Sequence, residues 1–377
     1  MNGKNLTSVL ALVTVGTAVV TACGSSGGGA AAPAGGSGST LSQSSISIGG
    51  STAGDFGLTW IADKAGFFKQ QGLTVKFVNF SAGTGSTSGI TSAFLGHSFD
   101  FLNNPATATL FAKQAGAPIT AVASVDEGSQ NQIAISDAAA ARLHIPAADG
   151  TPAEATKQLL ALKGSHITIG VTGTSSTSYT TIAALLQLNG LTYGVNAPGK
   201  DVDFVTTGTA NTQVAGFLAG KFDAIASTPP QTTKPDTVVI SLGLIPPVAQ
   251  GAGLYLATLD SFAQAHPDTV QAVVNAEVEA WAYAKKNPAA AEKLMVSMYA
   301  ENGVTDPAAA ASLFAVQSKY WETPVMSQAA YNSAVKVINL GSKTPISLGF
   351  SSWCDDAFVD KAIKNPSLTL GQSVPAT

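Results

Sequence analysis

The chain contains 377 residues, with 19 Lys and Arg against 23 Asp and Glu, and its formal net charge at pH 7 is −4. Apolar residues make up 45% of the chain and charged residues only 11%, a balance that supports a packed core and excludes general disorder. The weak acidity excludes nucleic acid as a partner, because phosphates require clustered Lys and Arg. Two cysteines and four scattered histidines exclude a disulfide framework and a structural zinc site, so we expect no metal and no cofactor.

The first 22 residues have the pattern of a lipoprotein signal peptide. Lys4 supplies a positive charge, and the apolar run over residues 6–20 is shorter than the about 20 residues that a membrane span needs. The run ends in Val-Thr-Ala-Cys, and small residues before Cys23 resemble a bacterial lipobox, in which the thiol is acylated and the chain is cut just before it. We therefore expect lipidation at Cys23 and an extracytoplasmic protein anchored to the cell membrane. An ordinary signal peptide with an incidental cysteine is the alternative.

Residues 23–45 are predicted to form a flexible tether. They are rich in Gly, Ser and Ala, carry no charge, and contain one large apolar side chain, Leu41. Such a segment buries too little surface to offset the entropy of ordering, so it is expected to be a coil with a reach of roughly 25 Å. This tether would keep a globular body close to the outer face of the membrane.

The remaining residues, 46–377, contain an internal repeat. Three short motifs recur in the same order, each about 120 residues after its first copy. The paired segments are Ile-Ser-Ile-Gly at 46–49 with Ile-Thr-Ile-Gly at 167–170, Gly-Leu-Thr at 72–74 and again at 190–192, and Phe-Leu-Gly-His-Ser-Phe-Asp at 94–100 with Phe-Leu-Ala-Gly-Lys-Phe-Asp at 217–223. Because order and spacing are kept, they indicate two copies of one structural unit.

Each copy is predicted to run strand, helix, strand, helix, strand. In the first copy these elements are expected at 46–49, 57–68, 75–80, from about 86, and 99–102, with Gly96 as a left-handed cap after the second helix. In the second copy they are expected at 166–171, 178–188, 201–205, 212–219 and 222–226. Strands that alternate with helices imply mostly parallel sheets flanked by helices on both faces.

The part of the chain after the second copy is predicted to be mainly helical. Two more strands are expected at 237–240 and 254–257, followed by helices at 268–286, from Pro288, near 308–320 and at 327–340. The tail is expected to pack back on the first copy, so the chain would cross twice between lobes, near 125–132 and 236–252. The predicted fold is therefore α/β with two lobes joined by two crossover segments. Lobe 1 comprises residues 46–126 with 246–377, and lobe 2 comprises residues 127–245.

Three segments of the sequence resemble one known family. Ala-Gly-Phe-Phe-Lys-Gln-Gln-Gly-Leu-Thr-Val at 65–75, the motif at 94–100 and the stretch at 279–292 resemble bacterial solute-binding lipoproteins of importers for sulfonate, taurine and nitrate. The same superfamily includes thiamine-pyrimidine precursor synthases and carriers. The resemblance implies a monomeric, type II-like periplasmic binding protein that closes on a small ligand. It also implies delivery of that ligand to the permease and ATPase subunits of an ABC transporter.

The ligand of such a fold is expected at the carboxyl ends of the strands, where loops lead into helix N-termini. Arg142 is the only arginine of the chain, so an anion site would have to use backbone N–H groups, hydroxyls or Lys. The loop at 172–179 carries many hydroxyls directly before a predicted helix, and the loop at 83–88 would face it from the other lobe. The alternative is that these Ser and Thr are only N-caps and turn formers. The expected ligand-binding residues in the two loops are Thr174, Ser175, Ser176, Thr177 and Tyr179, and Gly85, Ser86 and Thr87.

Two further groups of candidates follow predicted strands. After the first strand, an aromatic ring beside a carboxylate suits an aminoalkyl group or a flat ring, although helical spacing equally suits Trp60 to the core. After the two matched Phe-Asp segments, polar side chains suit hydrogen bonds to a ligand, and neighbouring prolines equally suit a strand end. The two groups are Asp55, Phe56 and Trp60, and Asn103, Asn104 and Thr228.

These observations favour a binding protein for a small organic anion, an aliphatic sulfonate or a taurine-like molecule. The alternatives are a neutral or aromatic heterocycle of the thiamine-pyrimidine type as ligand, and a tethered sensor without transport. An enzyme of the pyrimidine-synthase type is disfavoured, because the resemblance would require a cysteine-rich motif that the chain lacks, so we expect no catalytic residue. Replacing Ser175 and Ser176 by Ala is expected to weaken anion binding and to leave the stability of the free protein nearly unchanged.

Overall fold

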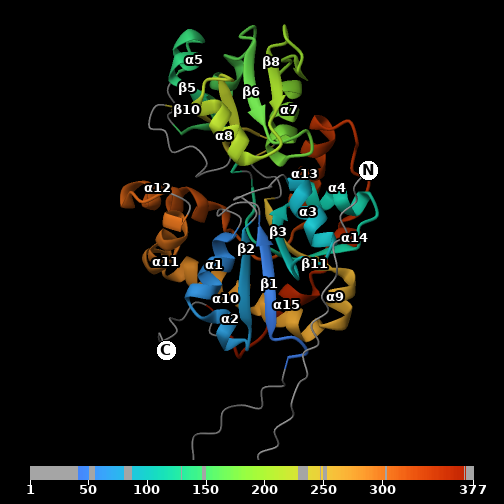
Figure 1. Ribbon diagram of the computed structural model, residues 1–377. Helices are drawn as coiled ribbons and strands as arrows, with labels where there is room; N and C mark the ends of the chain where they lie inside the picture. The colour runs from blue at the N-terminus through green and yellow to red at the C-terminus, as the bar shows by residue number, and fades with distance from the viewer. Residues whose placement is uncertain are drawn as a thin grey trace, which may run out of the picture. The chain divides into compact units, whose positions relative to one another are not determined.

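The computed structural model describes residues 41–50, 56–79, 87–128, 130–146, 150–227, 237–246, 248, 253–301, 304–368 and 370. All of them belong to one unit that starts at Leu41 (Figure 1). The expected signal peptide, Cys23 and most of the expected tether lie outside the described residues. Within these residues, none of the helices has the length and apolar character needed to cross a membrane.

The first sheet has five strands in the order β2-β1-β3-β11-β4. Its members are β1 (Ser45–Gly50), β2 (Thr74–Asn79), β3 (Phe101–Pro105), β4 (Ile119–Ser124) and β11 (Leu254–Leu259). β1 pairs in parallel with β2 and β3, while β11 is antiparallel to β3 and β4. The strands are short apolar runs because helices cover both faces of the sheet.

Helices on the two faces of the first sheet form separate apolar clusters. Phe101 of β3 packs into a cluster with helices α1 (Gly57–Lys64), α10 (Pro267–Lys286) and α11 (Pro288–Glu301). Its neighbour Leu102 points to the opposite face and packs against α3 (Thr87–Leu95). The remaining elements of this half are α2 (Phe67–Gln70), α4 (Ala106–Gln114), α9 (Asp260–Ala265), α12 (Pro307–Gln317), η4 (Ser318–Tyr320), α14 (Phe350–Trp353) and α15 (Ala357–Ile363).

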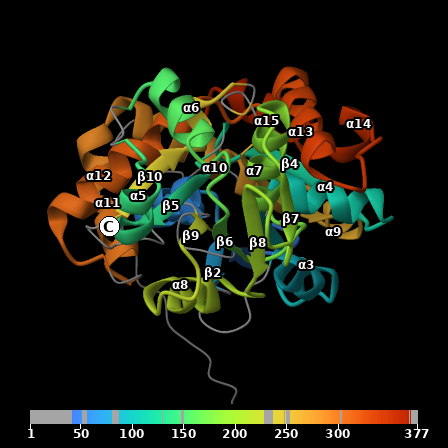
Figure 2. The ribbon, with the colours of Figure 1, turned by 90° about the horizontal axis from the view of Figure 1, so that it is seen from above.

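The second sheet has six strands in the order β10-β5-β9-β6-β8-β7 (Figure 2). They are β5 (Gln132–Ser136), β6 (Ile167–Val171), β7 (Tyr193–Val195), β8 (Val202–Thr206), β9 (Ala224–Ser227) and β10 (Thr237–Ser241). The helices of this half are α5 (Asp137–Arg142), α6 (Pro152–Leu160), α7 (Thr177–Leu188) and α8 (Ala210–Leu218), with η2 (Leu242–Leu244) after the last strand. The edge strand β7 was not predicted, and it has no counterpart in the first sheet.

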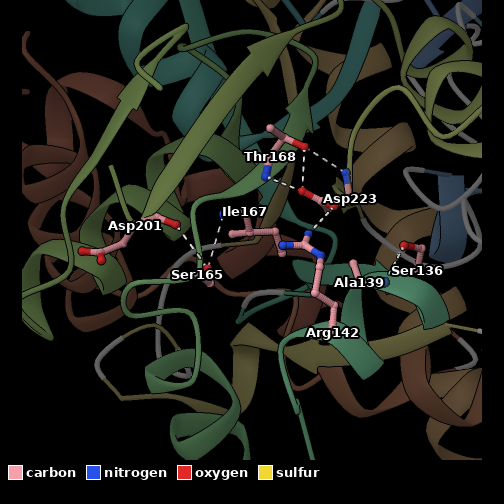
Figure 3. A network of polar contacts seen from close by, with 8 residues as sticks. All are labelled: Ser136, Ala139, Arg142, Ser165, Ile167, Thr168, Asp201 and Asp223. Atoms are coloured by element: carbon pink, nitrogen blue, oxygen red, sulfur yellow. Dashed lines mark hydrogen bonds and ion pairs between the residues drawn. The ribbon is translucent and has the colours of Figure 1, made fainter. Parts of the chain in front are cut away.

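Matching hydrogen bonds confirm the predicted repeat. In the first half, Asp100 accepts hydrogen bonds from the backbone N–H and the hydroxyl of Ser47, both at 2.8 Å. In the second half, Asp223 accepts the same two bonds from Thr168, both at 2.9 Å (Figure 3). Asp100 thereby ties the start of β3 to β1, and Asp223 ties the start of β9 to β6. Asp223 also forms an ion pair with Arg142 at 2.6 Å, so the only arginine has a structural partner.

The two halves also share the packing of an aromatic ring on a glycine. A Cβ atom on Gly49 of β1 would lie 2.5 Å from the ring of Phe99, and one on Gly170 of β6 would lie 2.6 Å from the ring of Phe222. Only glycine leaves room for these rings. The repeated Ile-Ser/Thr-Ile-Gly motif is therefore a packing requirement in both sheets.

Two predicted helix ends differ in the structure. The helix expected at 57–68 is divided into α1 and α2, because Gly66 between them adopts φ +82°. Gly96 is not the left-handed cap after α3: the left-handed residue is His97, with φ +60°, and its counterpart Gly220 has φ +69°. The prediction was wrong by one residue because α3 ends at Leu95, which leaves Gly96 one position too early to close the helix.

The antiparallel strands are exchanged between the halves. β5 follows β4 of the first sheet along the chain but joins the second sheet, and β11 follows β10 but joins the first. Tyr255 of β11 is paired with Asn104 of β3, and Gln132 of β5 is paired with Ser227 of β9. Both members of one pair lie 123 residues from their counterparts in the other, so the repeat extends over strands that the motif comparison did not match.

The two crossover segments, near the predicted positions, are tied together by one carboxylate. Asp126 in the first crossover is 2% exposed and accepts hydrogen bonds from the backbone N–H of Leu254 at 2.6 Å and from Nε2 of Gln130 at 2.7 Å. Leu254 is the first residue after the second crossover. A Cβ atom on the preceding Gly253 would collide with this carboxylate, which fixes the close approach of the two segments.

Helix α13 (Gln328–Gly341) contacts both halves (Figure 2). Its Val337 belongs to the apolar core of the second sheet, whereas Tyr331 and Ile338 belong to a cluster beside β4 and β11. Gly341 lies so close to α7 that a Cβ atom would be 2.1 Å from the carbonyl oxygen of Thr180. The tail helix is thus a third connection between the halves, which sequence analysis assigned to lobe 1 alone. The division into lobes stays a prediction.

Candidate functional site

The loop between β6 and α7 brings the predicted hydroxyls together but gives them different roles. Ser176 caps α7: its Oγ accepts a hydrogen bond from the N–H of Tyr179 at 3.2 Å and donates one to the carbonyl of Gly173 at 2.7 Å. The side chains of Thr174 and Ser175 are exposed, and neither hydroxyl is engaged by another described residue. The hydroxyls of Thr174 and Ser175 are therefore available to a ligand, while that of Ser176 is already hydrogen-bonded to Gly173 and Tyr179.

Three predicted residues open onto one hollow of about 720 Å³. Thr174, Ser175 and Tyr179 form part of its wall, together with β7 and Gln187 of α7. The other wall consists of Phe111 from α4 and residues 340–344, which are the end of α13 and the turn after it. Both halves of the chain thus contribute to this hollow.

Two tyrosines of the hollow pack against the same buried ring. The rings of Tyr179 and Tyr193 contact Phe204 edge-on, with centroids 4.8 and 6.1 Å from it. Burial raises the pKa of both hydroxyls, and the nearby Tyr193 raises that of Tyr179 further. A tyrosine hydroxyl is protonated at neutral pH even at its usual pKa, so both groups are hydrogen-bond donors, and that of Tyr193 donates to Oε1 of Gln187 at 3.5 Å.

Asn103 and Asn104 point to opposite faces of the first sheet. Both side chains are fully buried; Nδ2 of Asn103 donates to Thr59 of α1 at 2.7 Å, and Nδ2 of Asn104 donates to Thr91 of α3 at 3.2 Å. The side-chain carbonyl oxygen of each asparagine has no hydrogen-bond partner among the described residues. Both residues occupy the carboxyl end of β3, as predicted. Because they are consecutive in the strand, their side chains lie on opposite faces of the sheet and cannot contact one ligand together.

Two buried titratable side chains, a glutamate and a tyrosine, lie near these asparagines on the two faces of the sheet. Glu277 of α10 is fully buried beside Thr59, and burial raises the pKa of its carboxyl to about 8, an effect that the Thr59 hydroxyl only partly counteracts. Across the sheet, burial and the nearby Glu127 raise the pKa of the Tyr255 hydroxyl well above its usual value. Glu277 is thus mostly neutral at pH 7, as Tyr255 is, and neither of these two side chains adds a negative charge next to the asparagines.

The structure places Phe56 and Trp60 in the core of the first half. Phe56 is 3% exposed, and its ring packs edge-on against Phe77 with centroids 5.3 Å apart. Trp60 is 7% exposed, and its indole N–H donates to the carbonyl of Leu294 at 3.2 Å and lies near Oγ of Ser297. The contacts of Trp60 correspond to the core alternative given for it above, whereas Phe56 was expected at the ligand and instead packs in the core.

The remaining predicted site residues are either outside the described part of the chain or at the first position of a helix. Asp55, Gly85, Ser86 and Thr228 lie outside the described residues. Thr87 is the first residue of α3, and Thr177 is the first of α7, with a buried hydroxyl that no described residue contacts by hydrogen bond. In the described part of the chain, no three His, Cys, Asp or Glu side chains come together as metal ligands.

Tyr255, Tyr193 and Lys343 lie beside predicted site residues but were not themselves predicted. A signal for Tyr255 exists, because the repeat spacing relates it to Gln132 at the same position of the other exchanged strand. Tyr193 follows the repeated Gly-Leu-Thr motif but belongs to the additional edge strand. Lys343 lies in the tail beyond every repeated motif, so only the packing of α13 on α7 could bring it here.

Residues 40–300 match the model of the NMT1-like family. The chain belongs to this family. The match covers both sheets and ends within α11, so α13 and the turn that follows it lie beyond the matched region. No curated protein sequence matches the chain.

Solved structures with the same fold include binding proteins and an enzyme. The ligand-binding component of an ABC-type import system from Staphylococcus aureus, with zinc bound, is 12% identical, with a TM-score of 0.65 over 85% of this chain and 99% of that chain. The alkanesulfonate-binding protein SsuA from Xanthomonas axonopodis pv. citri, bound to MOPS, is 17% identical, with a TM-score of 0.55 over 79% and 90%. The desulfurization enzyme DszB is 16% identical, with a TM-score of 0.54 over 84% and 99%. At these identities the likeness establishes the periplasmic-binding-protein fold alone.

Proposed function

We propose that the protein is an extracytoplasmic solute-binding protein of an ABC importer that captures a small organic anion, an aliphatic sulfonate or a taurine-like molecule. The observation that carries the proposal is the exposed hydroxyl pair Thr174 and Ser175, at the carboxyl end of β6 and directly before α7. Ligands of open α/β sheets bind at this kind of position. The fold shared with binding proteins of importers, one of which binds alkanesulfonate, supports the same class of function.

The chemistry of this loop suits a sulfonate held by neutral donors. Arg142 is paired with Asp223, so the chain has no other guanidinium to offer an anion. Hydroxyl groups and the free N–H groups at the start of a helix donate hydrogen bonds to anionic oxygens, and the helix dipole favours negative charge there. Sulfonate has three such oxygens spread around one sulfur atom and can accept several of these bonds at once.

Binding is proposed to close the two halves around the ligand. The crossovers joined at Asp126 would serve as the hinge, because they are the segments through which the chain passes between the sheets. A ligand that binds the closed arrangement more tightly shifts the population toward it. The closed, loaded protein would then be the form that the permease and ATPase subunits receive.

The anchoring of the protein is proposed from its sequence. Lipidation at Cys23 would hold a monomeric binding protein at the outer face of the membrane. Labelling with a radioactive fatty acid in the host is expected to mark the wild type and not the Cys23→Ala variant. A labelled variant, or a wild type recovered without label, would contradict this part of the proposal.

Aromatic ligands form a second candidate class, favoured by Tyr179 and Tyr193. Their rings pack against Phe204 and line the same hollow as the loop between β6 and α7. They could stack on a flat heterocycle. Catalysis, as in the enzyme DszB, finds no such support at Cys354: the thiol is buried, and burial together with Asp356 raises its pKa to about 12. A thiol that stays protonated is a weak nucleophile.

A ligand panel in a thermal-shift assay tests the proposed function. The panel contains propanesulfonate, taurine, nitrate and a 4-aminopyrimidine, each tested alone. A ligand present at 100 times its Kd stabilises the folded protein by about 2.7 kcal/mol, which is a shift of several degrees. We expect propanesulfonate or taurine to give this shift. Stabilisation by the pyrimidine alone would favour the second candidate, and no shift with any compound would overturn the proposal.

A further inference from the structure

Among the described residues that line the hollow beside α7, one carries a formal positive charge and none a negative one. The charged residue is Lys343, in the turn after α13. The side chain is exposed, and no ion pair joins it to an acid within the described residues. An ammonium group without an acidic neighbour in the described part of the wall attracts anions and does not attract cations.

The backbone of this turn is held firmly against α7. Gly341 approaches the carbonyl of Thr180 more closely than any side chain would permit. Asn339 clamps the other side of the turn: its Oδ1 accepts from the N–H of Ile346 at 2.6 Å, and its Nδ2 donates to the carbonyl of Ile346 at 3.0 Å. The base of Lys343 is therefore fixed beside the second half of the molecule, although its residue belongs to the tail.

The groups that face Lys343 across the hollow are donors and aromatic rings. Thr174 and Ser175 offer hydroxyls that no described residue engages, and Tyr179 and Tyr193 offer half-buried, uncharged rings. An anion is therefore attracted from two sides, while the rings provide surface for an organic group. A volume of about 720 Å³ leaves space for both parts of such a ligand.

We propose that this hollow binds the organic anion itself: its charged group lies between Lys343 and the hydroxyls of Thr174 and Ser175, and its apolar or aromatic part lies against Tyr179 and Tyr193. The inference rests on the proposed function and adds the counter-charge and the ligand class. The site favours a sulfonate that carries a ring or a substantial chain over a small inorganic anion. Lys343 is the residue that makes it selective for charge.

Titration calorimetry with a charged and an uncharged probe tests this site. Benzenesulfonate and benzenesulfonamide share the ring, and only the first carries a full negative charge. The wild type is expected to bind benzenesulfonate more tightly than the sulfonamide, with an affinity that falls as salt rises. Lys343→Gln is expected to weaken benzenesulfonate binding about tenfold and to leave sulfonamide binding unchanged. Lys336→Gln, which removes an exposed lysine of α13 outside the hollow, is the matched control and is expected to bind both probes like the wild type.

A second variant tests the aromatic wall. Tyr193→Leu is expected to weaken both ring-bearing probes several-fold, because it removes the ring and keeps an apolar side chain. Equal benzenesulfonate affinity in the wild type and Lys343→Gln would overturn the inference, as would a wild type that binds no benzenesulfonate. If the wild type still responds to propanesulfonate or taurine in the thermal-shift panel, the proposed function survives that result; if it responds to nothing, both fail.

Discussion

At the scale of single residues, a hydroxyl that is already hydrogen-bonded within the protein stabilises the fold, whereas an exposed one without such a bond can bind a ligand. Ser175 and Ser176 are neighbours with the same hydroxyl, yet the first is exposed and the second is 5% exposed and bonded to its own loop. The expectation that both could be replaced without loss of stability is therefore revised. The N-cap role of Ser176 gives it a structural cost that Ser175 lacks.

Single replacements at these two positions are expected to separate the two roles. Ser176→Ala removes the cap of α7 and should lower the free energy of unfolding by about 1 kcal/mol. Ser175→Ala should leave stability unchanged and weaken binding of an anionic ligand. Urea unfolding and titration calorimetry on both variants measure the two effects. Equal stability losses in the two variants would refute the assignment.

The buried carboxyl of Glu277 is expected to make the free energy of unfolding depend on pH in one direction. Its pKa is about 8 in the folded protein and near 4.5 when exposed, so between these values the folded state keeps a proton that the unfolded state releases. Stability contributed by this group is therefore present at low pH and declines as pH rises from about 4.5 to 8, by at most about 1.4 kcal/mol per pH unit.

We expect the neutral variant Glu277→Gln to lose this dependence. Compared with the wild type, it should gain stability steadily as pH rises from 5 to 8, and the difference should level off above that range. Urea unfolding at half-unit intervals of pH measures the two curves. Parallel curves for wild type and variant would show that the carboxyl is not held neutral in the fold.

At the scale of elements, helix α13 has a position that its own sequence pattern does not reveal. The periodicity predicted the helix at 327–340, and the structure has it at Gln328–Gly341. The pattern could not indicate that two stripes would pack on two different cores, with Val337 in one and Ile338 in the other. Gly341 is what permits the close contact with α7.

Gly341→Ala is therefore expected to be costly. Its Cβ atom would overlap the backbone of Thr180, and overpacking of this kind costs about 1–3 kcal/mol. Gly349→Ala is the matched control, because the nearest atom to its Cβ, in Ser352, would be 3.8 Å away. Thermal unfolding of the two variants measures the difference. If both melt like the wild type, the α7–α13 contact is looser than the structure has it.

At the scale of the whole molecule, the chain joins two related sheets by exchanging one strand in each direction. Asp126 connects both crossovers at this exchange, and Asp126→Ala would leave the N–H of Leu254 and the amide of Gln130 without their partner. Both groups are partly buried, and leaving groups of this kind unpaired costs up to about 1–3 kcal/mol. Asp360→Ala, which removes an exposed ion pair with Lys364, should cost much less. Urea unfolding compares the variants, and equal losses would argue against a special role for the crossover carboxylate.

Local rules of the sequence determined the elements and the repeat. Strands, helices and the matched motifs follow from spacing of apolar residues, from glycines that need φ > 0 or close packing, and from aspartates that bond to a nearby strand; these are short-range requirements written in neighbouring residues. The loop before α7 was found for the same reason. Tertiary structure alone decided that Phe56 is a core residue and chose the core alternative for Trp60. It also decided that Asn103 and Asn104 face opposite ways and that Lys343 lines the same hollow as Thr174 and Ser175. Those outcomes depend on which surfaces meet when distant segments pack, and no single segment carries that information.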